Sequence, residues 1–243
     1  MFIQVIAMRS IRYMLVQTAV RLAGYKRLFN LNEQGLSDHI EKTKEKRNVR
    51  PLRFILKRHQ VQALRVHGRP CYVVSSQNGN NAQKAVLFLY GGGMFMEATI
   101  FHWMVVSKLV KQLSATVWVP AYPLVPEHTF SDATEMLLKS YQEMLEKHPA
   151  NEITFLGDSV GAALSFMLCH RNKASAKPLP MPQNLILVSP GMVTGADPKL
   201  REAMDRILPH DPMLGTGFMD AMAEIMQLNQ DQNDIFPLHS AGI

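Results

Sequence analysis

The sequence has few cysteines and no long hydrophobic run. Its 243 residues include two cysteines, Cys71 and Cys169, which are too few for a disulfide framework. Both lie in apolar runs that we expect to be buried, and the expected compartment is a reducing cytoplasm. No apolar run is long enough to span a membrane. Residues 1–8 are apolar but lack a preceding basic region and a clear cleavage site, so they do not predict a signal peptide.

Acidic residues are scarce in the first part of the chain. Residues 1–70 carry 15 Lys and Arg against 4 Asp and Glu, a balance of +11. The remaining residues carry 11 against 16, a balance of −5, and the two sum to the net charge of +6. We interpret the basic N-terminal part as a solvated helical face, and peripheral contact with an anionic membrane or lipid aggregate is the alternative. No nucleic-acid reader motif accompanies the charge, so we expect no nucleic-acid partner.

The pattern of apolar runs predicts strands that alternate with helices. Apolar residues make up 47% of the chain and charged residues 19%, as in a globular protein. The expected strands are 60–66, 71–74, 85–90, 115–121, 153–156 and 184–188. The expected helices are 11–28, 37–47 (helix or loop), 100–113, 131–147, 162–169, 199–207 and 218–228. This order favours an α/β fold with a mainly parallel, doubly wound sheet. Residues 85–90 are apolar throughout, which predicts a central strand buried on both faces, and residues 184–188 predict another buried strand.

The most informative motif joins a predicted strand to a predicted helix. Residues 157–161 read Gly-Asp-Ser-Val-Gly, a G-x-S-x-G pattern in the strand-to-helix context of a nucleophile elbow. Ser159 would then occupy a very tight turn. Gly157 and Gly161 have no side chains, so they leave the space that this turn needs on each side. The Val160 amide would begin the helix and place a partial positive charge beside the serine hydroxyl. A glycine-rich turn without chemistry is the alternative interpretation.

A second motif follows the apolar strand 85–90. Gly91, Gly92 and Gly93 free backbone amides from the sheet and allow a ligand to approach closely. Together with the Val160 amide, two of these amides would form a three-donor oxyanion hole. A flexible loop or a phosphate cradle is the alternative, but the Gly-Lys-Ser/Thr sequence of a P-loop does not follow.

Three blocks of the sequence resemble the α/β-hydrolases of the hormone-sensitive-lipase type, the carboxylesterases and lipases with a GDXG motif. Residues 91–93 match the His-Gly-Gly-Gly motif, and residues 157–161 match Gly-Asp-Ser-Ala-Gly. Residues 122–130, Tyr-Pro-Leu-Val-Pro-Glu-His-Thr-Phe, resemble the Tyr-Arg-Leu-Ala-Pro-Glu loop. The resemblance extends from about residue 58 to the C-terminus, and the order and spacing of the blocks fit. It implies a parallel sheet flanked by helices, with a helical N-terminal cap.

The resemblance also implies roles for individual residues. Ser159 would be the nucleophile, and the amides of Gly92, Gly93 and Val160 would stabilise the oxyanion. Glu127 and Asp158 would orient loops near the site, although a surface or capping role is an equal alternative for Glu127. A small-molecule ester would be the substrate, with no metal or cofactor. Residues 1–50 would form the cap over the acyl pocket, and residues 51–243 the hydrolase core.

Two departures from the family pattern affect this interpretation. Tyr90 stands where the family has a histidine that tethers the glycine loop, and a phenol is also able to form hydrogen bonds. More seriously, the triad acid and histidine of the family follow a later strand. Residues 231–243, which include Pro237 and Leu238, resemble the stretch just before that strand. We therefore expect the C-terminal strands and helix of the fold to be missing and the core to be incomplete.

None of the histidines in the chain is an obvious substitute base. His170 lies on the helix behind Ser159, and His210 and His239 follow the last predicted strand. His102 and His128 precede the serine, in the regions of the glycine loop and the proline-rich loop.

A serine without a base is a poor nucleophile at neutral pH. Two functions therefore stay open from the sequence. One is an acyl-ester hydrolase whose remaining triad members lie outside this chain. The other is a non-catalytic ligand-binding protein, or an inactive fragment, on the same scaffold.

Overall fold

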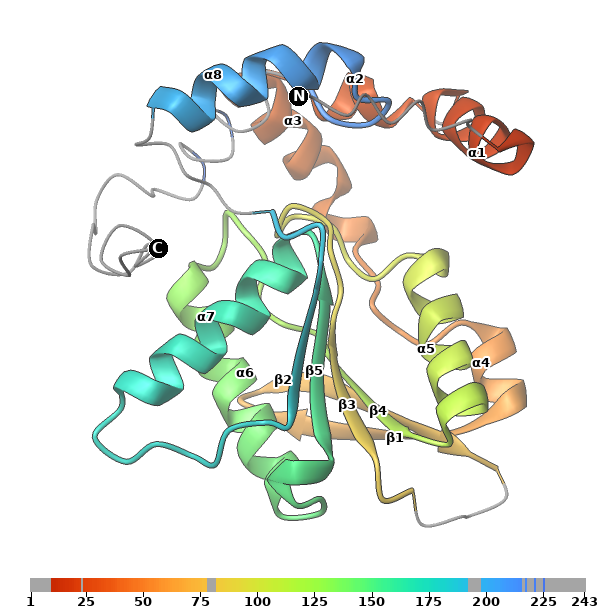
Figure 1. Ribbon diagram of the computed structural model, residues 1–243, viewed down its shortest axis with the longest axis vertical. Coiled ribbons are helices and arrows are strands. Elements are labelled where there is room, and N and C mark those ends of the chain that lie inside the picture. The colour runs from red at the N-terminus through yellow and green to blue at the C-terminus, as the bar shows by residue number, and fades with distance from the viewer. Residues whose placement is uncertain are drawn as a thin grey trace, which may run out of the picture. The chain divides into compact units, whose positions relative to one another are not determined.

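The computed structural model of the protein describes residues 10–22, 24–77, 82–191 and 198–215, together with positions 217, 221 and 225 (Figure 1). The strands are β1 (His59–Val66), β2 (Arg69–Ser76), β3 (Ala85–Leu89), β4 (Thr116–Pro120), β5 (Ile153–Asp158) and β6 (Asn184–Val188). The α-helices are α1 (Ile11–Leu22), α2 (Tyr25–Leu28), α3 (Glu33–Thr43), α4 (Arg53–Arg58), α5 (Ile100–Leu113), α6 (Phe130–Leu145), α7 (Val160–Ala174) and α8 (Pro198–Ile207). Three short 3-10 turns are η1 (Lys44–Lys46), η2 (Ala150–Glu152) and η3 (Leu208–His210).

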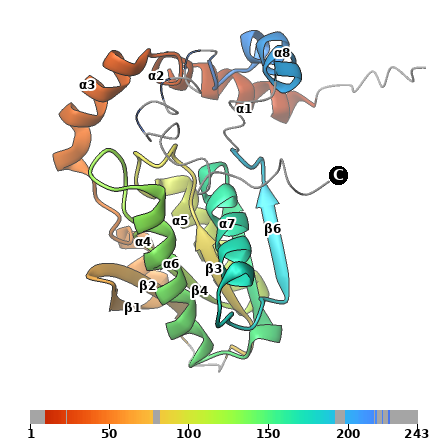
Figure 2. The same ribbon diagram turned by 90° about the vertical axis from the view of Figure 1, so that its left-hand side faces the viewer.

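The six strands form one mixed sheet in the order β1-β2-β4-β3-β5-β6. The β1–β2 hairpin joins β4 in antiparallel fashion, whereas β4, β3, β5 and β6 run parallel to one another. Helices α6 and α7 lie on one face of this sheet and α5 lies on the other (Figures 1 and 2). The predicted α/β fold is thus confirmed. Because β3 and β5 are adjacent and parallel, the loops that follow them emerge at the same edge of the sheet.

The centre of the sheet is completely buried. All five residues of β3 are buried, as the apolar run at 85–90 predicted. In β4, Val117, Trp118 and Val119 have no exposed surface, and α5 contributes Trp103 to the same core. A strand covered by helices on both faces must be apolar at every position, since neither set of side chains reaches water.

Strand β6 differs from the expectation. Residues 184–188 predicted a buried strand, but Ile186 is 47% exposed and Val188 49% exposed. The reason is position: β6 pairs only with β5 among the described residues and lies at the edge of the sheet (Figure 2). Helix α7 follows β5 and packs against β6, so the strand is covered in part. The apolar sequence of β6 is therefore that of an interior strand in an edge position.

The chain divides into two compact units. One contains residues 43–192 and 230–243 and includes the whole sheet; the other contains residues 1–42 and 193–229. In the second unit the Lys26 ammonium group donates hydrogen bonds to the carbonyl oxygens of Leu208, Pro209 and Asp211, at 2.8–3.3 Å. The expected division into residues 1–50 and 51–243 treated the units as consecutive segments. The observed contacts join the N-terminal helices to the segment after α8, and the boundary at residue 50 stays a prediction.

The predicted helix 11–28 is interrupted. Gly24 has a φ of 73°, in the left-handed region, and α1 and α2 lie on either side of it. This backbone conformation has little cost for glycine but breaks the helical hydrogen-bond pattern. No helix among the described residues has the length and apolar character needed to cross a bilayer. The predicted helix 218–228, apart from positions 221 and 225, and the tail at 231–243 lie outside the described residues.

A matched pair of leucines tests the asymmetry of the sheet. Leu87 is fully buried in β3, and Leu185, in the same row of paired residues, is 37% exposed in β6. We expect Leu87→Ala to lower the free energy of unfolding by about 2–5 kcal/mol, because it leaves a cavity. Leu185→Ala should lower it by about 1 kcal/mol or less. Urea unfolding followed by circular dichroism measures both. Equal losses would show that β6 is covered in solution.

Candidate active site

Ser159 occupies a strained turn at the carboxyl end of β5. Its backbone angles are φ 50° and ψ −123°, and α7 begins at the next residue. Few non-glycine residues adopt such angles unless the surroundings impose them. Here the Ser159 amide donates to the Val188 carbonyl at 2.9 Å, and the Ser159 carbonyl accepts from the Gly191 amide at 3.0 Å. The end of β6 and the loop behind it therefore hold the turn in place.

Two glycines make this turn possible by allowing backbones to meet. A methyl group at Gly157 would overlap the carbonyl group of Gly161. A methyl group at Gly161 would overlap the Leu89 carbonyl and lie 2.6 Å from the Tyr90 carbonyl oxygen. The first turn of α7 thus packs directly on the end of β3, with no space for a side chain between them. This is the close approach that the G-x-S-x-G spacing predicted.

The triple-glycine loop lies against the serine turn. The Gly91 amide donates to Asp158 Oδ1 at 3.1 Å, and a methyl group at Gly91 would lie 3.1 Å from Ser159 Cβ. Gly92 and Gly93 have φ angles of 136° and 58°, which favour glycine. Asp158 therefore orients the loop by a direct hydrogen bond.

Three backbone amides of the glycine loop and the serine turn have no acceptor among the described residues. Within the described part of the chain, the amides of Gly92, Gly93 and Val160 donate to no protein acceptor. The Val160 amide is the first of α7, where helical amides lack intrahelical partners and the helix dipole is positive. The Val160 amide and the helix dipole suit an anionic oxygen bound beside Ser159.

The proline-rich loop supports the glycine loop from the other side. The Tyr122 hydroxyl donates to the Tyr90 carbonyl oxygen at 2.6 Å, and the Val125 amide donates to the Met94 carbonyl oxygen at 2.9 Å. Through these two contacts the loop at 122–130 packs against residues 90–94.

Glu127 anchors the proline-rich loop through an arginine from outside it. The Arg47 guanidinium bonds Glu127 at 2.8 Å and the Val125 carbonyl oxygen at 2.9 Å. Partial burial acts in the opposite direction, but the hydrogen bond from Arg47 lowers the pKa of Glu127 below its ordinary value. Glu127 therefore acts on the loop, not on the position of the hydroxyl at Ser159.

Tyr90, which replaces the family histidine, has a carboxylate partner. Its ring is fully buried and stacks on that of Tyr122, with ring centroids 4.6 Å apart. Its hydroxyl donates to Glu97 Oε2 at 2.8 Å. Burial raises the pKa of Glu97, and the Tyr90 hydrogen bond opposes this shift without reversing it. The pair closes the glycine loop on itself, since Tyr90 precedes the glycines and Glu97 follows them.

His102 is the histidine that the structure brings to the serine turn. Its Nδ1 accepts a hydrogen bond from the Thr99 amide at 2.9 Å, and its Nε2 lies 3.4 Å from Asp158 Oδ2. Because Nδ1 is an acceptor, the neutral ring carries its proton on Nε2, facing Asp158. Both nitrogens are thus engaged, so His102 positions Asp158 and is not free to take the serine proton. His128 lies 3.9 Å from Asp132 on α6 instead.

The other histidine candidates lie on α7, in the other unit or outside the described residues. His170 is exposed on α7, past its midpoint, and His210 ends η3 in the other unit. His239 lies outside the described residues.

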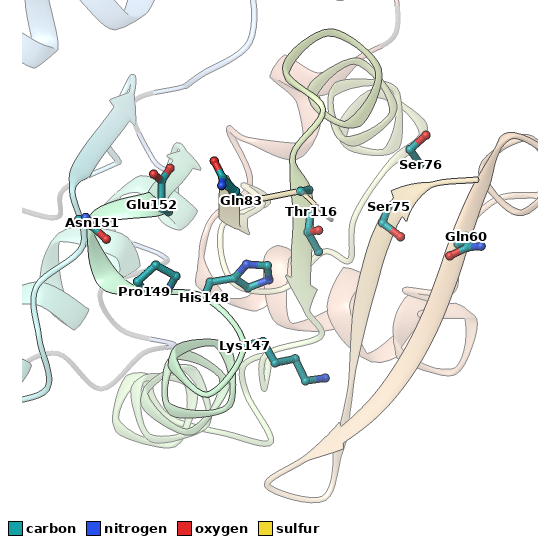
Figure 3. Close-up of a pocket in the computed structure, with 11 residues that line it drawn as sticks. Gln60, Ser75, Ser76, Gln83, Thr116, Lys147, His148, Pro149, Asn151 and Glu152 are labelled. Atoms are coloured by element: carbon teal, nitrogen blue, oxygen red, sulfur yellow. The ribbon is translucent and has the colours of Figure 1, made fainter. Parts of the chain in front are cut away.

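A hollow of about 720 Å³ lies at the opposite end of the sheet (Figure 3). Thr116 at the start of β4, Gln83 before β3 and Glu152 before β5 line it, together with Lys147 and His148. Ser159 follows the other end of β5, so this hollow is separate from the candidate active site.

Comparison with known proteins agrees with this geometry. The family described as the alpha/beta hydrolase fold matches residues 86–241, more than half of the chain. The chain belongs to the α/β-hydrolase family. A triacylglycerol lipase from Mycobacterium tuberculosis is 30% identical over 116 residues, which are 45% of this chain and 25% of that protein. An esterase from Acinetobacter venetianus is 30% identical over 132 residues, which are 54% of this chain and 42% of that protein.

Solved α/β-hydrolases share the fold. An esterase from the bacterial hormone-sensitive lipase family superposes with a TM-score of 0.69 at 17% identity, covering 92% of this chain and 71% of that one. The chain spans a quarter to about two fifths of the two curated relatives.

Sequence reasoning missed several residues of this site. Thr99 and His102 form a capping box at the start of α5, and their three-residue spacing was a signal that the helix begins there. Glu97 is an isolated acid in an apolar stretch just after the glycines, which signalled a buried partner. The only sequence signal for Gly191 was its place in the turn sequence Ser-Pro-Gly at 189–191, which does not indicate a contact with Ser159.

The close contact of α7 with β3 predicts a strict requirement for glycine. Gly161→Ala should lower the free energy of unfolding by about 3 kcal/mol or more, because its methyl group meets backbone and not a mobile side chain. Gly35→Ala, on helix α3, is the control. Its methyl group would meet the side-chain oxygen of Asn32 at 3.0 Å, and a side chain is able to move where backbone is not. We expect a near-neutral effect there, and urea unfolding measures both. Similar effects of the two substitutions would contradict the described packing.

Glu97 predicts a pH-dependent effect on stability. The fold holds its pKa above the ordinary 4.5, so folding favours the protonated carboxyl. The protonated carboxyl therefore contributes to the free energy of unfolding of the wild type, and this contribution is lost as pH rises through the raised pKa. The Glu97→Gln side chain does not ionise, and its amide oxygen can still accept the hydrogen bond from the Tyr90 hydroxyl. We expect the free energy of unfolding of Glu97→Gln, relative to wild type, to increase as pH rises above 4.5. Urea titrations over a pH series test this, and the values below that pH are the internal control. A constant difference would contradict burial of the carboxylate.

Proposed function

We propose that the chain supplies the nucleophile and the oxyanion hole of a serine hydrolase that cleaves carboxylic esters. The observation that carries the proposal is the strained turn at Ser159, which the triple-glycine loop contacts. The relatives named esterase and triacylglycerol lipase support ester hydrolysis as the reaction. A small-molecule ester is the proposed substrate.

In the proposed reaction, Ser159 Oγ attacks the ester carbonyl carbon while its proton passes to a general base. The carbonyl oxygen becomes an oxyanion, which accepts hydrogen bonds from the amides of Gly92, Gly93 and Val160. The bond to the alcohol then breaks, the alcohol leaves with a proton, and an acyl-Ser159 ester remains. Water hydrolyses this ester by the same steps.

The general base is the missing element among the described residues. His102 is engaged by Thr99 and Asp158, and no other described histidine contacts the serine turn. A hydrolase that lacks triad residues retains roughly 10³–10⁴-fold acceleration from its oxyanion hole and binding alone. We therefore propose that this chain reacts slowly, and that a complete enzyme obtains the base from residues outside the described ranges.

The engaged state of His102 also favours a second candidate, a protein that binds a small ligand beside Ser159 without turnover. The same three amides would then bind a carbonyl or carboxylate oxygen. We further propose a cytoplasmic location, which the free thiols of Cys71 and Cys169 support.

Reaction with p-nitrophenyl butyrate distinguishes the two candidates. We expect a slow, serine-dependent release of nitrophenolate and a butyryl group on the peptide that contains Ser159, detected by mass spectrometry. Ser159→Ala should reduce the release to the rate without protein. Equal rates for wild type and Ser159→Ala would reject the serine mechanism. Binding of butyrate without acylation would support the second candidate.

A further inference from the structure

Exposed apolar side chains gather on two helices of the sheet-containing unit. Among the described residues, Phe101 is 65% exposed and Met104 45% exposed on α5, and Leu56 is 54% exposed on α4. Ile100, Val105 and Leu113 extend the apolar surface along α5. Helices α6 and α7, on the opposite face of the sheet, have no large apolar side chain that is exposed to this extent. We call the outward surface of α4 and α5 the α4–α5 face.

Basic residues share this face with the apolar ones. Helix α5 buries Trp103, Val106 and Val110 and turns Phe101, Met104 and Lys108 outward, at helical spacing. Helix α4 contributes Arg53, Lys57 and Arg58, all exposed. Its end lies beside α5, because His59 Nε2 is 2.7 Å from Ser107 Oγ.

Acidic residues are nearly absent from the whole segment that builds this face. Residues 46–126 contain eleven Lys and Arg but a single acid, Glu97, which is turned inward to Tyr90. Neither α4 nor α5 contains Asp or Glu. Helix α6, by contrast, exposes Glu135 and Glu143 together with Lys139. The two faces of the sheet therefore differ in both charge and apolar exposure.

We propose that the α4–α5 face docks on an anionic membrane surface. A helix with exposed apolar side chains and lysines, but no acids, matches the boundary between acyl chains and negatively charged headgroups. Phe101 and Met104 enter the acyl boundary, while Lys108 and Lys111 contact the headgroups. A protein partner fits less well, because lysines are depleted in protein interfaces.

The basic N-terminal part of the chain is the alternative membrane contact. Helix α1 exposes Ile11 and Leu15, but its unit also exposes the acids of α3 and α8, including Glu33, Glu41 and Glu202. These acids would repel an anionic surface, whereas the α4–α5 face carries none. The proposal therefore assigns the lipid contact to the unit that contains the sheet, and it does not depend on ester hydrolysis.

Vesicle sedimentation with the full 243-residue chain tests the proposal. We expect binding to phosphatidylcholine vesicles that contain phosphatidylglycerol, weaker binding to phosphatidylcholine alone, and release by salt. The double variant Phe101→Ser, Met104→Ser should weaken binding at least about tenfold, through lost apolar burial. The double variant Lys108→Gln, Lys111→Gln should weaken it by roughly fivefold per lysine.

Two variants on other surfaces serve as matched controls. Lys139→Gln removes an exposed lysine from α6, and Leu15→Ser removes an exposed apolar side chain from α1. Neither should change vesicle binding, and circular dichroism verifies that each variant is folded. If the Phe101 variant fails to fold, the lysine pair decides the question.

Three outcomes would overturn the proposal. The first is that wild type does not bind anionic vesicles. The second is that Leu15→Ser abolishes binding while the α5 variants retain it, which would assign the contact to α1. The third is that the α5 variants change only self-association, measured by light scattering, which would identify the face as a contact between copies of the chain.

Discussion

The direct contact between the first turn of α7 and the end of β3 is the constraint on which the candidate site depends. Gly161 allows the α7 backbone to reach the carbonyl groups of Leu89 and Tyr90, and Gly157 allows the chain to reverse so closely. This contact imposes the strained φ of 50° at Ser159. It also fixes where the chain leaves β3, and hence where the glycine loop begins. A larger residue at position 161 would separate these two crossovers and the amides that they supply.

The site is then closed by polar contacts between three loops that are distant in sequence. Asp158 accepts a hydrogen bond from the Gly91 amide and faces His102, so the acid beside Ser159 orients the glycine loop. Tyr90 and Glu97 connect the two ends of that loop through a buried hydrogen bond. Buried polar groups are stable only when they are satisfied, so these residues form one network.

The sequence predicted the elements whose signal is local. Buried strands such as 85–89 and the G-x-S-x-G turn follow from apolar runs and glycine spacing, and the structure contains both. It did not predict the exposure of Ile186, because the apolar character of a strand does not reveal whether a neighbour covers it. Nor did it predict that Lys26 bonds carbonyl groups near position 210, since such a contact depends on tertiary packing. The role of His102 was missed for the same reason: its partner is 56 residues away in the sequence.

No described histidine is free to act as the base for Ser159, but this does not affect the other features of the candidate site. Every contact that shapes the Ser159 turn comes from residues 85–191, within one compact unit. The proposed oxyanion donors, the amides of Gly92, Gly93 and Val160, belong to that unit, so their positions do not depend on the base. In serine hydrolases each such donor contributes about 10²–10³ in rate, and loss of the catalytic histidine costs more, about 10⁶. In the proposed reaction these amides would already be in place for an oxyanion, and the group that accepts the serine proton would determine whether the site binds or cleaves an ester.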